Sequence, residues 1–442
     1  MTALRNTQRH SHRRQFLKTS AAASGAALAA GLGVQRAAHA AGSDILKVGL
    51  VGCGGRGTGA AANALTADPN CQLIALADVF PEKMESTLKS VKKRFGDRVT
   101  VDPDHCFADF DGYEKLLASG VDMVILATPP HFRPLHLKAA VDAGVHVFCE
   151  KPVAVDAPGV RSVLQTTEEA DKKGLSIVSG LCWRYHFAVL ETMKRVRDGA
   201  IGQIVSIQET YNTGHVGRSQ PRQSGWTEME YQLRNWYFFT WLSGDHNVEQ
   251  HVHSLDKASW AMGDRPPVRA WGLGGRQVKK DPKYGDIYDH HAVVYEYENG
   301  TRVYAYCRQQ PGCWNSTEDY FFGTKGTCNV LNKYQISDLN GKTVWRYRGP
   351  GCNMYEEEHR ALFRAIRSGN PINNGRYMAI STMLAILGRM VTYTGQAIGW
   401  DQALHSAETL SPSGYAWDAQ PPTVPGPDGR YPVAVPGVTK FA

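Results

Sequence analysis

Short apolar runs alternate with helical segments between residues 46 and 149. Four of these runs have the length of a buried strand, and they cover residues 46–51, 72–77, 122–127 and 144–149. The segments that follow the first and third runs, at 59–65 and 136–143, predict helices. Strands that alternate with helices are typical of a parallel doubly wound sheet, whose binding site lies at the carboxyl ends of its strands.

The pattern changes after residue 200, where apolar and polar residues alternate with the period of half-buried strands. This alternation covers 204–211 and 292–304, and Asn299-Gly300 predicts a hairpin turn inside the second run. Helical periodicity returns at 356–366 and 378–393. We expect the apolar faces of these two helices to pack back onto the body of the protein, through Leu362, Phe363, Ile366, Met383, Leu384, Leu387 and Val391.

The first forty residues have the pattern of an export signal. Arg13-Arg14 and Phe16-Leu17-Lys18 precede a weakly hydrophobic stretch at 21–34, and Ala38-His39-Ala40 completes the pattern of a secretory signal peptide. The paired arginines resemble the bacterial twin-arginine signal, a receptor-read address. Because the apolar stretch is too short to span a bilayer comfortably, we expect no stable membrane anchor. We expect the twin-arginine export machinery to deliver the chain to the periplasm or the exterior.

The basic excess of the chain belongs to this leader. The sequence has 49 Lys and Arg against 42 Asp and Glu, and six of the cations but none of the acids precede residue 41. The remaining charges nearly balance, which argues against a nucleic-acid partner. The nine cysteines form no CxxC pair. Since the twin-arginine route implies folding in a reducing compartment, we expect neither a disulfide framework nor a zinc finger.

A glycine-rich turn follows the first predicted strand. Gly52-Cys53-Gly54-Gly55-Arg56-Gly57 fits G-x-G-x-x-G, which lets the backbone approach a pyrophosphate at a helix N-terminus. Asp78 ends the second strand, at the spacing of the acid that binds the adenosine ribose. A carboxylate there accepts hydrogen bonds from the 2′-hydroxyl and repels a 2′-phosphate. The sequence therefore predicts NAD as the cofactor and makes NADP the weaker candidate.

Two further motifs make the chain resemble a known family. Thr128-Pro129-Pro130 followed by His136, and Gly144-x-His146-Val147-x-x-Glu150-Lys151-Pro152, are similar to motifs of the glucose–fructose oxidoreductase / inositol dehydrogenase / rhizopine-catabolism (Gfo/Idh/MocA) family. The resemblance runs from about residue 45 to about residue 395. It implies an α/β protein with an N-terminal Rossmann domain and a C-terminal α+β domain, whose large, mostly antiparallel sheet covers the nicotinamide and forms the sugar pocket.

This resemblance and the patterns above divide the chain into four parts. We expect a signal peptide over 1–40, a Rossmann domain over 44–165, a substrate domain over 166–400 with helices that pack back, and an irregular Pro- and Gly-rich arm over 401–442. Large exposed sheets in this family commonly pair, so the resemblance also implies a homo-oligomer.

Lys151 is the first candidate catalytic residue. It lies at the carboxyl end of a strand, where its ammonium can stabilise a developing oxyanion, and Pro152 restricts its backbone to an extended conformation. The family pattern Asp-x-x-x-His-x-x-Asp aligns with Glu249, His253 and Asp256, with Glu in place of the first Asp. On one helix, Glu249 and His253 would share a face. We expect His253 to act as general acid or base and Glu249 to bind a sugar hydroxyl or orient the imidazole.

Other candidate residues bind the cofactor or the substrate. The expected cofactor contacts are Gly52, Gly54, Gly55, Arg56, Gly57, Asp78, Thr128, Pro129, His131, Glu150, Lys151 and Arg184, of which Arg184 rests on the resemblance. The expected sugar contacts are Lys151, Tyr185, Trp236, Tyr237, Glu249, His253 and Tyr288. Any one of these aromatic side chains can equally be a packing residue.

The segment around Glu249 also permits a metal site. Asp245, His246, His251 and His253 crowd together there. We expect no metal, because the spacing does not reproduce a known zinc helix and a dehydrogenase pocket explains the same residues.

Three functions are compatible with these observations. The first is an exported NAD(P)-dependent oxidoreductase that acts on a sugar or glycoside hydroxyl and keeps its cofactor tightly bound, because free NAD is scarce outside the cytoplasm. The second is an NAD-dependent glycosidase of the α-N-acetylgalactosaminidase type, which oxidises the sugar transiently at C3, eliminates the aglycone, adds water and reduces again. The third is a non-catalytic sugar or NAD sensor on the same fold. Glu150-Lys151-Pro152 favours the first.

Overall fold

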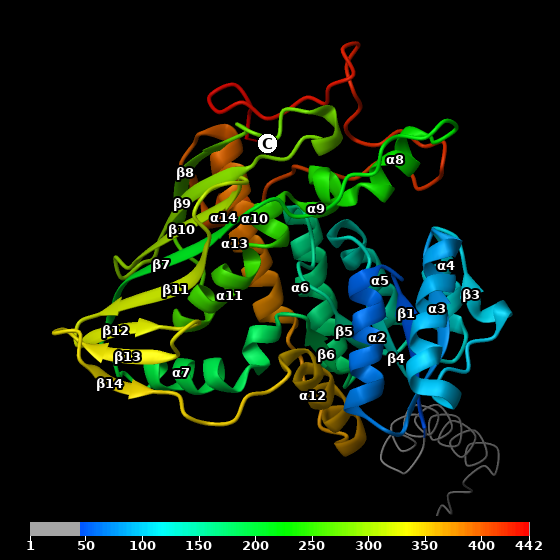
Figure 1. Cartoon of the computed structure of the whole chain (residues 1–442), viewed down its shortest axis with the longest axis horizontal. Helices are drawn as coiled ribbons and strands as arrows, with labels where there is room; N and C mark the ends of the chain where they lie inside the picture. Colours follow the sequence, from blue (N-terminus) through cyan, green and yellow to red (C-terminus); the bar gives the residue numbers. More distant parts are fainter. Residues whose placement is uncertain (1–44, 442) are drawn as a thin grey trace, which may run out of the picture.

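The computed structural model describes residues 45–441, in which a six-stranded and a nine-stranded sheet lie on either side of a set of central helices (Figure 1). The predicted export signal lies outside the described residues. Within residues 45–441, no helix is long and apolar enough to cross a membrane. All nine cysteines lie in this range, and all are free thiols.

The first sheet is parallel and has the strand order β3-β2-β1-β4-β5-β6. Its strands are β1 (Leu46–Val51), β2 (Cys71–Ala77), β3 (Cys106–Phe107), β4 (Met123–Leu126), β5 (His146–Cys149) and β6 (Ile177–Ser179). The four predicted strands are all present. The short β3 and β6 were not expected, and β6 carries the sheet past the domain boundary that the sequence predicts at residue 165.

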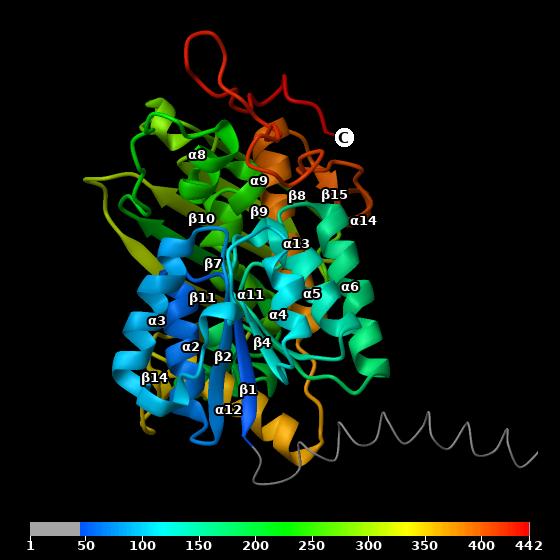
Figure 2. The same cartoon turned by 90° about the vertical axis from the view of Figure 1, so that its right-hand side faces the viewer.

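Helices cover both faces of this sheet (Figure 2). They are α2 (Gly55–Ala67), α3 (Pro81–Phe95), α4 (Gly112–Ala118), α5 (Arg133–Asp142) and α6 (Ala157–Lys172). The strand and helix alternation therefore produces the Rossmann architecture that the sequence predicts.

The second sheet has the order β14-β13-β12-β11-β7-β10-β9-β8-β15. Its strands are β7 (Ile204–Thr213), β8 (Arg269–Gly275), β9 (His290–Glu296), β10 (Arg302–Gln309), β11 (Ser316–Gly323), β12 (Gly326–Asn329), β13 (Gln335–Asp338), β14 (Thr343–Arg346) and β15 (Ile398–Gly399). Among these strands only β7 and β10 pair in parallel. The hairpin predicted at Asn299-Gly300 joins β9 to β10, and Gly300 has φ +80°, a conformation that glycine adopts readily.

The remaining helices lie between the sheets or at their ends. They are α7 (Phe187–Arg197), α8 (Glu228–Arg234), α9 (Thr240–Ser243), α10 (His246–Glu249), α11 (Val252–Ala261), α12 (Met354–Ser368), α13 (Gly375–Thr394) and α14 (Trp400–Leu404). Short 3-10 turns occur at Gly96–Arg98, Pro103–His105, Pro130–Phe132, Cys182–Tyr185, Trp236–Phe238 and Pro282–Tyr284. From residue 405 to residue 441 the chain forms the predicted irregular arm.

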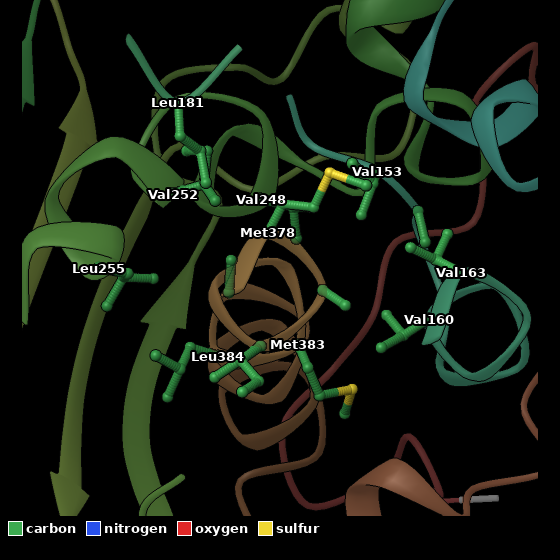
Figure 3. Close-up of a cluster of buried hydrophobic side chains, with 14 of the residues drawn as sticks. Val153, Val160, Val163, Leu181, Val248, Val252, Leu255, Met378, Met383 and Leu384 are labelled. Carbon is green, nitrogen blue, oxygen red and sulfur yellow. The ribbon is translucent and has the colours of Figure 1, made fainter. Parts of the chain in front are cut away.

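Helix α13 joins the two domains through one hydrophobic core (Figure 3). Met383 and Leu384 of α13 are buried, and the same cluster holds Val160 of α6 and Leu255 of α11. Burial of each such side chain stabilises the fold by about 1.5–3 kcal/mol. Because this core connects the Rossmann domain to the second sheet, it fixes the position of Lys151 relative to Glu249 and His253.

Helix α12 packs back in the same way. Its Leu362, Phe363 and Ile366 belong to a buried cluster with Leu50 of β1 and Ile125 of β4. The predicted packing of both C-terminal helices is thus confirmed.

Candidate active site

The glycine-rich turn between β1 and α2 is shaped for close backbone contacts. Gly52 has φ +96°, and a Cβ there would lie 2.5 Å from the Thr128 nitrogen; a Cβ on Gly57 would lie 1.8 Å from the Gly52 oxygen. By contrast, a Cβ on Gly54 or Gly55 would meet nothing within 4 Å. Gly52 and Gly57 therefore serve packing, whereas Gly54 and Gly55 leave open space at the N-terminus of α2.

This open space belongs to a pocket at the carboxyl ends of the parallel strands. Seven of the predicted cofactor residues line it, namely Gly52, Gly54, Gly55, Arg56, Asp78, Thr128 and Pro129. No side chain caps the N-terminus of α2, so its first N–H groups and the helix dipole are available to phosphates. The pocket therefore fits the pyrophosphate and adenosine of a dinucleotide.

Asp78 is held firmly at the end of β2. Its carboxylate accepts hydrogen bonds from the Cys53 N–H at 2.7 Å and the Phe80 N–H at 2.9 Å. Burial raises its pKa, an effect that the charge of Lys83 opposes. Each oxygen of a carboxylate has two lone-pair sites, so Asp78 keeps acceptor capacity for a ribose hydroxyl.

Arg56 connects the glycine-rich turn to the Glu150-Lys151-Pro152 motif. Its Nε donates to Glu150 Oε1 at 2.5 Å, and its guanidinium lies 3.9 Å from Glu358 of α12. Glu358 is fully buried and has no hydrogen-bond partner among residues 45–441, and burial followed by the charge of Glu150 raises its pKa well above the ordinary value. Glu150 and Arg56 thus tie the nucleotide-binding turn to the strand end that carries Lys151.

Lys151, just past the end of β5, and Glu249, at the end of α10, are in direct contact. Lys151 Nζ lies 3.0 Å from Glu249 Oε1 and 2.6 Å from the Glu249 backbone oxygen. The side chains are 13% and 11% exposed. An ammonium has three N–H donors, and two of them serve Glu249, so one remains for a substrate oxygen.

His253 completes this group, although not as the sequence predicts. Glu249 ends α10 and His253 belongs to α11, with Gln250 and His251 at the break, so the two residues do not share one continuous helix. Burial, and then the charges of Lys151, Lys257 and Arg56, hold the pKa of His253 well below its usual range. The imidazole is therefore neutral at pH 7, and its buried Nδ1 has no hydrogen-bond partner in the part of the chain that the structure describes.

Two tyrosines and a glutamine that the sequence analysis missed lie beside this group. The Tyr211 hydroxyl donates to Gln250 Oε1 at 3.1 Å. Burial, followed by the charges of Glu249 and Tyr355, raises the pKa of Tyr211 to about 12. The Arg56 guanidinium lies 4.9 Å from the centre of the Tyr355 ring. The alternation of β7 identifies Tyr211 as inward-facing, but no local signal relates Tyr355 to Lys151, since about 200 residues separate them.

Several predicted site residues are engaged elsewhere. Arg184 is buried in ion pairs with Asp256 and Asp264, at 2.8 and 2.6 Å, so it supports α11 and not a nicotinamide. The hydroxyl of Tyr185 donates to Asn374 Oδ1 at 2.7 Å. The hydroxyl of Tyr237 accepts from Gln309 Nε2 at 2.6 Å.

Three more predicted residues have contacts that the sequence does not predict. Trp236 lines the nucleotide pocket instead of a sugar site. His131 Nε2 lies 2.8 Å from the Tyr415 hydroxyl, and Tyr288 is buried with its hydroxyl on the Ala434 oxygen at 2.8 Å. Sequence alone could not separate these positions from substrate contacts, because an aromatic residue in a core and one in a pocket have the same local pattern.

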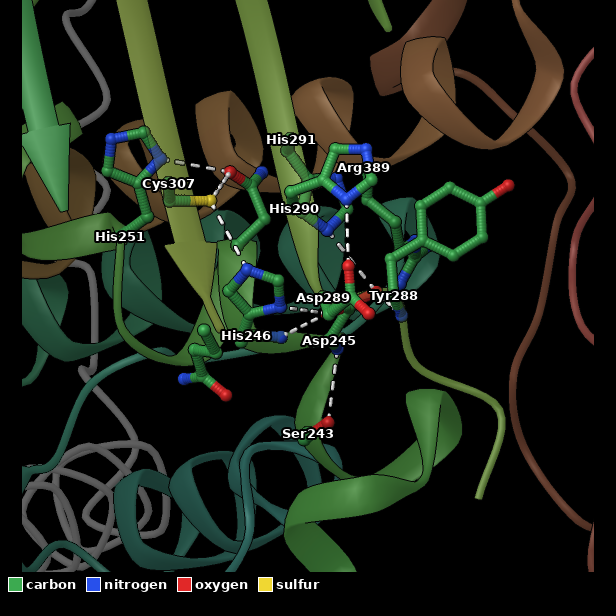
Figure 4. A network of polar contacts seen from close by, with 12 residues as sticks. Ser243, Asp245, His246, His251, Tyr288, Asp289, His290, His291, Cys307 and Arg389 are labelled. Atoms are coloured by element: carbon green, nitrogen blue, oxygen red, sulfur yellow. Dashed lines mark hydrogen bonds and ion pairs between the residues drawn. The ribbon is translucent and has the colours of Figure 1, made fainter. Parts of the chain in front are cut away.

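The histidine-rich segment also contributes to a sealed polar network, which we call the Asp245 network (Figure 4). The Asp245 carboxylate accepts from His246 Nδ1 at 2.8 Å, the Tyr288 N–H at 2.9 Å and the Tyr393 hydroxyl at 2.6 Å. His291 Nε2 lies 3.4 Å from the same carboxylate. These contacts hold Asp245 at φ +78°, a backbone conformation that is strained for a residue with a Cβ.

Asp245, His246 and His291 place their ligand atoms within 4.8 Å of one another, a spacing that could hold a metal ion. However, the carboxylate of Asp245 is already occupied by protein donors. Burial favours the neutral carboxyl, but the interactions and hydrogen bonds with His291 and His246 outweigh it and hold the pKa of Asp245 well below its usual range. The geometry therefore supports a network that fixes α10, and it gives no specific support to a metal.

Two family models match this chain. Residues 46–178 match the model of the oxidoreductase family with an NAD-binding Rossmann fold, and residues 189–329 match the GFO/IDH/MocA C-terminal domain. This chain belongs to the Gfo/Idh/MocA family. The fold class that the sequence predicts for a Gfo/Idh/MocA protein is confirmed.

Curated relatives of this Gfo/Idh/MocA chain have different activities. It is 26% identical over 212 residues to the 2,7-anhydro-N-acetylneuraminate hydratase of Escherichia coli, a match that covers 48% of this chain and 51% of that protein. It is 24% identical over 296 residues to the inositol 2-dehydrogenase of Rhizobium meliloti, covering 66% and 77%. It is 27% identical over 170 residues to a glycosyl hydrolase family 109 protein of Phocaeicola vulgatus, covering 38% and 31%. The chain thus spans about half of the hydratase's length.

Solved structures share the fold. The aldose-aldose oxidoreductase of Caulobacter crescentus has a TM-score of 0.62 at 20% identity, with 80% of this chain and 99% of that chain covered. GenD2 from gentamicin A biosynthesis, solved in complex with NAD, has a TM-score of 0.59 at 19% identity, with 80% and 96% covered. At this identity the likeness describes the Gfo/Idh/MocA fold alone.

Proposed function

We propose that this chain is an exported NAD-dependent oxidoreductase that acts on a hydroxyl of a sugar or glycoside. The observation that carries the proposal is the contact of Lys151 with Glu249, near a neutral His253 and one residue from Glu150, whose carboxylate binds Arg56 of the glycine-rich turn. These residues supply one ammonium donor and one imidazole acceptor next to a dinucleotide pocket. That pair is what oxidation of an alcohol requires from a protein.

The residues divide the chemistry as follows. A bound NAD, held by the glycine-rich turn and Asp78, would supply the hydride acceptor for the carbon that carries the reacting hydroxyl. Lys151 donates its remaining N–H to the hydroxyl oxygen and stabilises the charge that develops there. His253 accepts the hydroxyl proton, because its depressed pKa keeps it neutral at pH 7. Glu249 holds the ammonium in place through two contacts.

NAD is favoured over NADP by Asp78. Its carboxylate lies in the pocket and is fixed by two backbone N–H groups. A 2′-phosphate at this position would face a negative charge, whereas a ribose hydroxyl would donate to it.

An exported enzyme would have to keep its cofactor bound. A twin-arginine signal would carry the folded chain with NAD already bound to a compartment that lacks free NAD. The hydride must then return to a second substrate in the same site, so we expect paired oxidation and reduction of two carbohydrates. The open face of the second sheet, with Leu273, Tyr306 and Phe322 exposed, supports pairing of two copies as a homo-oligomer.

A second candidate is an NAD-dependent glycosidase with transient oxidation, elimination, hydration and re-reduction. The match to a glycosyl hydrolase family 109 protein and to an anhydro-sugar hydratase supports it. The same Lys151 and His253 would serve the oxidation step. The two candidates differ in outcome, since the glycosidase releases an aglycone and causes no net redox change.

The first test measures the cofactor itself. Purified mature protein that has received no cofactor is denatured, and the supernatant is analysed for NAD(H) and NADP(H) by mass spectrometry. About one NAD per chain supports the proposal, and a screen of glycosides for hydrolysis or for paired oxidation and reduction then separates the two candidates. An empty protein that binds added NAD only weakly would contradict a retained cofactor.

A further inference from the structure

The nucleotide pocket has an outer wall that does not come from the Rossmann domain. Leu233 of α8 and Trp236, in the turn that follows, line it opposite Asp78, Phe80 and Phe110. The side chain of Arg234 reinforces this wall. Its guanidinium lies 4.1 Å from the centre of the Phe80 ring and forms a 2.6 Å ion pair with Glu82.

Behind this wall lies the C-terminal arm, residues 405–441, which runs over α8 and returns to the second sheet (Figures 1 and 2). Trp417 of the arm packs on Phe80 and Phe110, with ring centres 5.6 and 5.1 Å apart. Tyr415 packs on Phe110 at 6.3 Å and on Phe132 at 5.4 Å. Phe80, Phe110 and Phe132 all line the pocket, so the arm contacts the backs of three pocket residues at once.

Hydrogen bonds anchor the arm on either side of residues 411–422, whereas this stretch itself has few. Its end contacts are Leu410 N–H to Asp156 Oδ2 at 2.9 Å, Gln232 Nε2 to the Thr423 oxygen at 2.7 Å, the Tyr431 hydroxyl to Glu228 Oε1 at 2.6 Å and the Gly437 N–H to the Thr394 oxygen at 2.9 Å. Between residues 411 and 422, the hydrogen bond from Tyr415 to His131 is the only one that joins the arm to the rest of the described chain. The other contacts of this stretch are made by the rings of Tyr415 and Trp417, by Ala419, which packs against the cluster around Phe80, and by Pro421, which is buried.

We propose that residues 411–422 form a strap that closes the adenosine end of the nucleotide site, and that exchange of NAD requires this strap to lift. The inference rests on the proposed function, because it assigns the strap to the same dinucleotide. Lifting breaks one hydrogen bond, two sets of ring contacts and the packing of Ala419 and Pro421, while the anchors on either side stay in place. It frees Phe80, Phe110 and Phe132 to move away from the adenosine.

The test compares release rates of NAD. Wild type, Trp417→Ala and Tyr415→Phe are loaded with isotopically labelled NAD, diluted into excess unlabelled NAD, and sampled by mass spectrometry. Trp314→Ala is the matched control, because Trp314 is 75% exposed on a distant loop of the second sheet. Circular dichroism at increasing temperature confirms that each variant is folded.

We expect Trp417→Ala to release NAD about tenfold faster than wild type, since two aromatic contacts are lost. Tyr415→Phe keeps the ring and loses only the bond to His131, so we expect a smaller, roughly threefold increase. Trp314→Ala should match wild type. Folded Trp417→Ala and Tyr415→Phe that release NAD at the wild-type rate would overturn the strap while leaving the proposed function intact. A wild type that binds no NAD would overturn both.

Discussion

Two clusters from one short segment of the chain show how similar residues come to have different roles. Asp245 and His246 form a 2.8 Å contact, and Glu249, three residues further on, forms a 3.0 Å contact with Lys151. The first cluster is sealed, and its carboxylate is filled by donors from α10, α13 and the strand β9 region. The second keeps one ammonium N–H available for a substrate, with a neutral imidazole nearby. The reactive cluster differs from the structural one in its spare hydrogen-bonding capacity and in the partial exposure of its side chains, and not in residue type.

The electrostatics of the Asp245 network follow from its burial. Burial outweighs the nearby carboxylate and lowers the pKa of His246 to about 4, so the pair exists at neutral pH as an ionised Asp and a neutral His. On its other side, His246 Nε2 lies 3.5 Å from Cys307 Sγ. This Cys-His-Asp order resembles that of a nucleophilic triad, but burial raises the pKa of Cys307 well above its ordinary value. The thiol is therefore unreactive and serves packing.

The largest expected effect concerns Lys151. Lys151→Ala removes the only cation that faces the reacting oxygen in the proposed chemistry, so kcat should fall by about 10³-fold. NAD content should stay at the wild-type level, because Lys151 does not line the adenosine pocket. Steady-state kinetics and mass spectrometry of the denatured protein measure the two quantities. Full activity of Lys151→Ala would remove this residue from catalysis.

The next largest effect concerns the Asp245 network and stability. Asp245→Asn replaces an acceptor with a donor while several protein donors still face it, so the free energy of unfolding should fall by about 3 kcal/mol. Chemical denaturation measures this value, and Asp428→Asn is the control because that side chain is 66% exposed. Turnover by the folded fraction should persist. A stable variant that has lost turnover would instead give Asp245 a catalytic role.

His253 should give a smaller effect than Lys151. His253→Gln keeps the size of the side chain and removes the proton acceptor, so kcat should fall by about 10²-fold with NAD still bound. The exposed His405, changed to Gln, is the matched control. If His253→Gln lost NAD together with activity, the residue would have a structural role.

The smallest expected effect is a loss of stability at acidic pH. Because the pKa of His246 is about 4 in the folded chain and about 6.5 when unfolded, the unfolded state binds more protons below pH 6.5. Protonation of His246 in the unfolded state should therefore leave the free energy of unfolding unchanged above pH 6.5 and lower it by about 2 kcal/mol at pH 5. Chemical denaturation of wild type and His246→Gln, above pH 6.5 and at pH 5, tests this prediction. The stability advantage of wild type over His246→Gln should shrink by about 2 kcal/mol at the lower pH. If the stability difference between the two proteins did not change with pH, His246 would not be the source of the acid sensitivity.

Much of the fold could be predicted from the sequence. The four buried strands, the Asn299-Gly300 hairpin and the apolar faces of α12 and α13 rest on local periodicity, which burial imposes directly. The strands β3 and β6 are too short to give such a signal. For this reason the sequence placed the end of the first domain before β6.

The candidate site was predictable only in part. Lys151, Glu249 and His253 came from motif and family pattern, and the structure brings Lys151 and Glu249 together. Arg184 and Tyr288 had the expected chemistry, but their partners, Asp256 and Ala434, come from distant parts of the chain. Tyr355 reaches Arg56 only because α12 packs back onto α2. Contacts of this kind depend on tertiary packing, and no local pattern encodes them.

One measurement tests the central claim most directly. Purified protein is mixed with a panel of sugars and glycosides without added cofactor, and the near-ultraviolet absorbance of reduced NAD is followed in a single turnover. The account predicts that a substrate produces up to one reduced NAD per chain in wild type and in folded Asp245→Asn, and almost none on the same timescale in Lys151→Ala. Equal reduction in Lys151→Ala, or its loss in folded Asp245→Asn, would contradict the division between the reactive and the structural cluster.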